Sequence, residues 1–122
     1  MFNFEKLEVW QVAVEYADAV YRATRDFPPD ERFGLTSQLR RASVSISSNI
    51  AEGCGRGSNK DFVRFVQIAY GSLMETISQL SIATKQGFLK ETDHSELYRL
   101  GERVARMLSR LRASLSKDDG HR

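Results

Sequence analysis

The residues of this chain best suited to chemistry are its arginines. The sequence has 122 residues, with thirteen arginines against five lysines. A guanidinium group is planar and always charged, and it pairs with carboxylates and phosphates through parallel hydrogen bonds. The excess of arginine therefore favours partners that carry such groups, although a solvated surface can have the same composition.

Eight cations are candidates for contacts with nucleic acid, in two groups. The first group is Arg40, Arg41, Arg56, Lys60 and Arg64, around the second expected helix and the loop after it. The second group is Arg103, Arg106 and Arg110, which with Arg99 repeat at spacings of 4, 3 and 4 on the last expected helix. Such a stripe is also typical of a solvated helix flank whose side-chain stems cover apolar surface.

The sequence does not predict catalysis. His94 stands at an expected helix start and His121 near the end of the chain, and neither can be placed beside a nucleophile. Cys54 has Arg56 nearby but no histidine to activate it. We therefore expect no enzyme and no catalytic residue.

No metal or cofactor site is expected either. Glu91 and His94 form one Glu-x-x-His unit, whereas di-iron bundles need two such units and two further glutamates. The Gly53-Cys54-Gly55 sequence lacks the preceding strand and the third glycine of a dinucleotide site.

The composition limits the classes of protein to which this sequence can belong. Hydrophobic residues make up 41% and charged residues 28%, as in soluble globular proteins. The sequence shows no apolar run long enough to span a membrane and no secretory signal, and it has one cysteine. We expect a single cytoplasmic domain over residues 1–122, without a membrane partner.

Charge is distributed unevenly although the net charge is only +2. Residues 1–31 carry a net charge of −4 and residues 32–64 a net charge of +4. Unlike patches on one protomer suit a head-to-tail contact between copies. The distribution therefore indicates self-assembly into a ring.

Four amphipathic segments predict an all-α fold. The expected helices cover about residues 5–26, 35–52, 59–86 and 93–116, and residues 117–122 should fray. Gly53 and Gly87 are expected just after helices, and Ser58 and Asp93 at N-caps. Short connections favour an up-down-up-down antiparallel four-helix bundle. The expected core is Leu7, Trp10, Val14, Leu39, Ile46, Phe65, Leu73, Leu80, Leu100, Val104 and Leu111.

Two helices have features that suggest burial on more than one side. Residues 42–51 read ASVSISSNIA, without charge and with small side chains that let backbones approach. In the next helix, Ile68, Tyr70, Met74 and Ile82 lie off the main apolar stripe. Glu75 in that helix is expected to have a cationic partner within the bundle or a subunit seam.

Three runs of residues carry a resemblance to a known family: LTSQLRRASVSISSNIAEG (35–53), FVRFVQIAYGSLMETISQL (62–80) and FEKLEVWQVAVEYA (4–17). The chain resembles small bacterial four-helix-bundle proteins named for open reading frames within intervening sequences of 23S ribosomal RNA genes. The same family includes the accessory variability determinant of diversity-generating retroelements. The likeness covers about residues 4–115.

The resemblance implies a four-helix bundle that assembles as a cyclic homopentamer, with a nucleic-acid role for its basic surfaces. Ser47 stands where the family has a proline, so the family's kink in this helix lacks its usual cause. The signature positions are Arg40, Arg41, Ser48, Asn49, Ile50, Ala51, Glu52, Gly53, Arg56, Phe62, Phe65, Gly71, Ser72, Leu73 and Glu75, of which Asn49, Glu52, Gly53 and Glu75 are expected to be structural.

The leading hypothesis for function is a non-enzymatic oligomer that binds the backbone of RNA or DNA through arginines. The alternative is an interaction scaffold that recruits another protein, such as a reverse transcriptase. Both hypotheses include self-association, and neither requires a cofactor.

Overall fold

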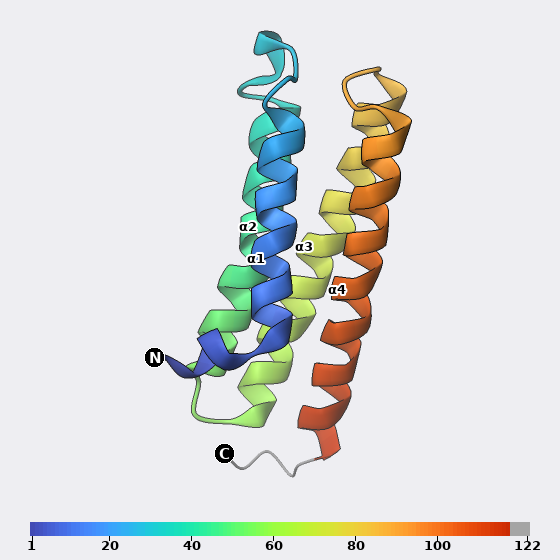
Figure 1. Ribbon diagram of the computed structural model, residues 1–122. Helices are drawn as coiled ribbons and strands as arrows, with labels where there is room; N and C mark the ends of the chain where they lie inside the picture. The colour runs from blue at the N-terminus through green and yellow to red at the C-terminus, as the bar shows by residue number, and fades with distance from the viewer. Residues whose placement is uncertain (118–122) are drawn as a thin grey trace.

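A computed structural model describes residues 1–117, which form a bundle of four α-helices with no strand. The helices are α1 (Glu8–Thr24), α2 (Leu35–Cys54), α3 (Asn59–Lys85) and α4 (Glu91–Lys117). Successive helices run in opposite directions and each packs against its two neighbours (Figure 1). This confirms the expected all-helical four-helix bundle. Over residues 1–117, no helix is long and apolar enough to cross a membrane.

Two short 3-10 turns and two local signals fix the connections. The turns η1 (Asn3–Lys6) and η2 (Pro29–Glu31) precede α1 and α2. Ser58 caps α3, because its Oγ accepts the backbone N–H of Asp61 at 3.2 Å. Gly87 follows α3 with a φ of +80°, in the left-handed region that glycine adopts without strain.

Other helix ends differ from the sequence expectation. Helix α2 continues through Gly53 to Cys54, and it is unbroken at Ser47. Helix α4 begins at Glu91, so Asp93 lies in its first turn instead of at the N-cap. Lys117 is helical instead of frayed, and the remainder of that expected tail, residues 118–122, lies outside the described residues.

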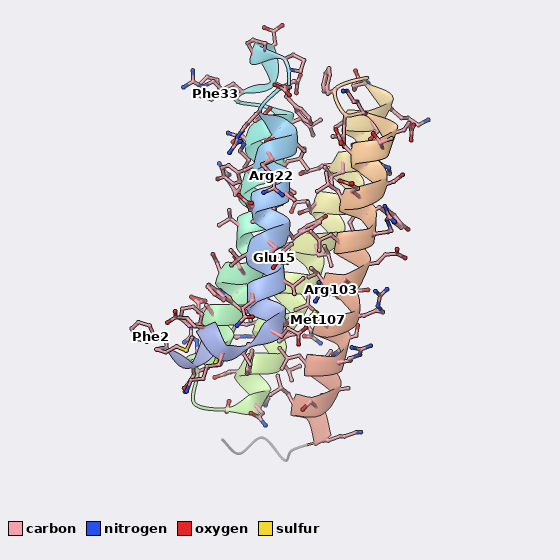
Figure 2. All side chains as sticks on the ribbon, viewed as in Figure 1. Phe2, Glu15, Arg22, Phe33, Arg103 and Met107 are labelled. Carbon is pink, nitrogen blue, oxygen red and sulfur yellow. The ribbon has the colours of Figure 1, made fainter. Side chains whose placement is uncertain are left out.

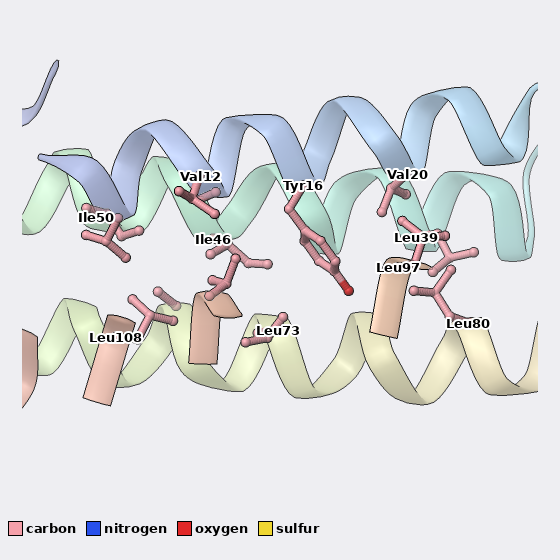
Figure 3. Packing of buried hydrophobic residues seen from close by; sticks show 14 of the residues in the cluster. Val12, Tyr16, Val20, Leu39, Ile46, Ile50, Leu73, Leu80, Leu97 and Leu108 are labelled. Atoms are coloured by element: carbon pink, nitrogen blue, oxygen red, sulfur yellow. The ribbon is translucent and has the colours of Figure 1, made fainter. Parts of the chain in front are cut away.

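The buried face of α1 is rotated from the expected one. Val12, Tyr16 and Val20 face the core (Figure 3), and Val9 is also buried. Val14 and Tyr21 are each 39% exposed. Trp10 is only half-buried, and it packs edge-to-face on Phe4 of η1, with ring centroids 5.0 Å apart. The expectation that Val14 belongs to the core is therefore wrong.

The remaining helices supply most of the expected core. The residues of the expected set that are buried are Leu39, Ile46, Phe65, Leu73, Leu80 and Val104. Leu7, Leu100 and Leu111 are partly buried and pack against this core. Leu97 and Leu108 are the fully packed leucines of α4.

Helices α2 and α3 form the most extensive contact in the bundle, and they approach closely at Gly53. A Cβ on Gly53 would lie 2.7 Å from Cβ of Phe65 and 2.8 Å from Cδ1 of Phe62. Further along the same seam, the hydroxyls of Ser45 and Ser72 hydrogen-bond each other at 2.9 Å. Gly53 is therefore required by helix packing and not by a left-handed helix end.

Tyr16 places a polar group in the middle of the core. Its side chain is fully buried, and its hydroxyl has no hydrogen-bond partner among residues 1–117. A Cβ on Gly101 of α4 would lie 3.3 Å from this hydroxyl, so the missing side chain at 101 makes room for the phenol. Burial raises the pKa of the Tyr16 phenol well above its usual range.

This buried phenol predicts a pH-dependent stability. Because its folded-state pKa is raised, the folded protein holds this proton more tightly than the unfolded chain does. Its contribution to stability is constant below pH ~10 and falls as the pH rises above that value. Tyr16→Phe should remove the part of the stability loss at alkaline pH that arises from the Tyr16 phenol. It should also raise the unfolding free energy at neutral pH by about 1 kcal/mol, since a buried unpaired donor is removed.

The measurement is urea unfolding of wild type and variant between neutral and alkaline pH. Tyr98→Phe, at an exposed tyrosine, is the matched control and should keep the wild-type pH dependence. A Tyr16→Phe variant that loses stability at neutral pH would show that the hydroxyl has a partner.

Candidate nucleic-acid interface

Arg40 and Arg41 lie in the first half of α2, where α1 holds Arg40 in one orientation. Arg40 Nε donates to Thr24 Oγ1 at 2.9 Å, and its guanidinium lies over the Tyr21 ring, 4.7 Å from the centroid. Thr24 is itself anchored, because its Oγ1 donates to the Val20 carbonyl at 2.8 Å. Arg40 is half-buried and Arg41 is exposed.

The other members of the first group lie at the opposite end of α2. Arg56 is in the α2–α3 connection, 15 residues beyond Arg41 along the chain, which corresponds to about 20 Å along a helix axis. The guanidiniums of Arg56 and Arg64 lie over the Phe65 ring, 4.9 Å and 5.4 Å from its centroid. Arg56 also pairs with Glu52 at 3.9 Å. The structure thus separates this group into two ends of the bundle.

The α4 stripe is partly neutralised by α1. Arg103 Nη2 lies 3.4 Å from Glu8 Oε1, and this ion pair joins the two helices. Arg106 and Arg110 are exposed on α4 and have no ion pair within residues 1–117. Exposed pairs such as Arg103–Glu8 contribute little to stability, about 0–1 kcal/mol.

The polar residues expected to be structural have local partners. Asn49 Nδ2 donates to the Ser45 carbonyl at 2.8 Å and to Ser45 Oγ at 3.0 Å. Glu75 is exposed, and its Oε2 accepts a hydrogen bond from Gln79 Nε2 at 3.2 Å. Glu75 has no cationic partner among residues 1–117, so that part of the expectation is wrong, whereas a partner across a subunit seam stays a prediction.

Six of the eight candidate cations make no ion pair with a carboxylate inside the described chain. These are Arg40, Arg41, Lys60, Arg64, Arg106 and Arg110. These cations are therefore available to pair with an external anion. An arginine guanidinium can donate two parallel hydrogen bonds to two oxygens of one phosphate. Within residues 1–117, no group of three or more His, Cys, Asp and Glu could hold a metal ion.

Sequence reasoning missed two residues beside Arg40 and Arg41. Arg32 and Phe33 follow η2, and with Tyr21 they line a hollow that reaches the first turns of α2. The Arg32 guanidinium lies 5.2 Å from the centroid of the Phe33 ring. An aromatic residue directly after an arginine in a short connector was the available signal.

Comparison with known proteins supports the fold and the family resemblance. The sequence model of the family described as 23S rRNA-intervening sequence protein matches residues 5–110. The chain belongs to this family. A solved structure described as a protein of unknown function from the S23 ribosomal protein family of Bacteroides thetaiotaomicron superimposes with a TM-score of 0.76. It is 20% identical, and the match covers 84% of this chain and 96% of that one.

This intervening-sequence family membership confirms the resemblance seen in the sequence. At 20% identity the structural likeness concerns the fold alone. No curated protein matches the chain.

Proposed function

We propose that this family member is a non-enzymatic cytoplasmic protein that binds RNA or DNA through backbone phosphates. The observation that carries the proposal is the set of six candidate cations without a carboxylate partner. Phosphate contacts by several arginines give sequence-independent, salt-sensitive affinity. The family's name refers to 23S rRNA, which is consistent with a nucleic-acid partner.

We also propose that the protein works as a cyclic homopentamer. Ile68, Tyr70, Met74 and Ile82 on α3 are between 39% and 50% exposed in the single chain. Apolar side chains on a helix that is already buried on its other face favour a contact with a second copy. A ring repeats each basic group and strengthens its field, which raises the affinity for a polyanion.

The nucleic-acid proposal predicts a steep salt dependence. Binding of labelled hairpin RNA and duplex DNA, measured by fluorescence anisotropy at several salt concentrations, should weaken linearly on logarithmic axes. Arg41→Gln, Arg64→Gln and Arg110→Gln each remove one unpaired cation, from three different parts of the bundle. A variant at a true contact should lower the salt slope by about 1.

The matched control is Arg22→Gln, because the Arg22 guanidinium already pairs with Asp18. This variant should bind as the wild type does. Absence of binding at low salt would contradict the proposal and favour the alternative function, a scaffold that recruits another protein.

The assembly proposal predicts that a charge on the α3 face dissociates the ring. Sedimentation should give the wild type a mass of five 13.9 kDa chains. Ile82→Glu should give a smaller species, because it places a carboxylate in an apolar contact. Ser109→Glu adds the same charge at an exposed position on α4 and should leave the mass unchanged. A monomeric wild type would contradict the proposal.

A further inference from the structure

The hollow at the α1–α2 end of the bundle combines positive charge with aromatic rings. It has a volume of about 390 Å³ and is lined by Arg32, Arg40 and Arg41, by the rings of Tyr21 and Phe33, and by hydroxyl residues of α2. No carboxylate lines it. The positive charge of these arginines is therefore not neutralised by any residue that lines the hollow.

The acidic residues near this end of the bundle make no ion pair with the arginines of the hollow. Glu31 Oε1 accepts the Leu35 backbone N–H at 3.1 Å, so it caps the start of α2. Asp26 and Asp30 are exposed and make no ion pair with an arginine among the described residues. An anion can therefore reach the three arginines without displacing a carboxylate from them.

Phe33 is the most exposed large hydrophobic side chain in the described part of the molecule, at 88%. It projects from the α1–α2 connection, away from the core (Figure 2). Arg32 lies against its ring at 5.2 Å, and the high exposure leaves most of the ring in water. A free aromatic face beside arginines is a surface on which an unstacked base can stack.

Arg40 is positioned for the phosphate that accompanies such a base. Its Nε is occupied by Thr24, and Tyr21 supports one face of its guanidinium. These contacts fix the plane of the side chain and leave its terminal nitrogens for an incoming oxygen. Arg41, in the next position on α2, is exposed and provides a second guanidinium that can hydrogen-bond a phosphate.

We propose that this hollow is a binding site for single-stranded nucleic acid, with a base stacked on Phe33 and adjacent phosphates held by Arg40 and Arg41. The inference rests on the proposed nucleic-acid function and specifies the substrate class at one site. A paired duplex stacks its bases on each other and offers no free base face, so it cannot use the Phe33 ring.

The test compares Phe33→Leu with wild type on a labelled oligouridine decamer, the same decamer lacking bases, and a duplex of equal length. Leucine keeps an apolar side chain but cannot stack. Phe33→Leu should weaken decamer binding roughly ten- to hundredfold and leave duplex binding unchanged. The baseless decamer should bind wild type and variant equally.

The matched control is Phe2→Leu, at a phenylalanine that is 73% exposed and stacks on Phe4, far along the chain from the hollow. It should bind all three probes as the wild type does. Equal loss of decamer and duplex binding, or no loss of either, would overturn the stacking site while the phosphate-binding function stands.

Two further outcomes would also overturn the proposed stacking site. A Phe33→Leu protein with a changed sedimentation mass would make Phe33 a contact between copies and overturn the proposal. A wild type that binds no probe at low salt would remove the proposed function, and this site with it.

Discussion

The close approach of α2 and α3 is the constraint on which the rest of the bundle depends. Gly53 lies so near Phe62 and Phe65 that even one methyl group would force the helices apart. Ser45 and Ser72 hold the middle of the same seam through a hydroxyl–hydroxyl hydrogen bond. Because small residues occupy α2 between 42 and 51, the helix can pack closely along α3, and α1 and α4 complete the core against this pair.

This use of α2 also explains where the cations lie. The packed middle of the helix has no charged residue, so arginines stand before that stretch, at Arg40 and Arg41, and beyond the end of the helix, at Arg56. The first pair joins Arg32 and Phe33 around one hollow, whereas Arg56 and Arg64 cover Phe65 at the other end. Packing thus divides a group that is nearly continuous in the sequence into two separate basic surfaces.

The helices could be predicted from the sequence because apolar periodicity and local end signals such as Ser58 and Gly87 act over a few residues. The register of α1 could not be predicted, because ten of the thirteen residues from Val9 to Tyr21 are apolar and more than one face could serve as the core. Only packing against the other helices decides that Tyr16, and not Val14, is buried in the core. The role of Gly53 was misread for the same reason: a glycine needed for helix contact and one that ends a helix look alike in sequence.

The candidate site was only partly predictable. Arginine spacing pointed to Arg40 and Arg41, but it could not show that Thr24 and Tyr21 orient Arg40, since they lie 16 and 19 residues earlier in the chain. Glu75 was misplaced because an apolar neighbourhood in sequence does not reveal which side of a helix faces water. Phe33 escaped notice because the connector lies outside every amphipathic pattern.

Unfolding of Gly53→Ala in urea tests the central structural claim most directly. The close α2–α3 contact predicts that the added methyl group lowers the free energy of unfolding by about 1–3 kcal/mol, since packed backbones must move to admit it. Gly57→Ala, where a Cβ meets nothing within 4 Å, should change it by less than about 0.5 kcal/mol. A Gly53→Ala protein as stable as the wild type would contradict the claim that this approach holds the bundle together.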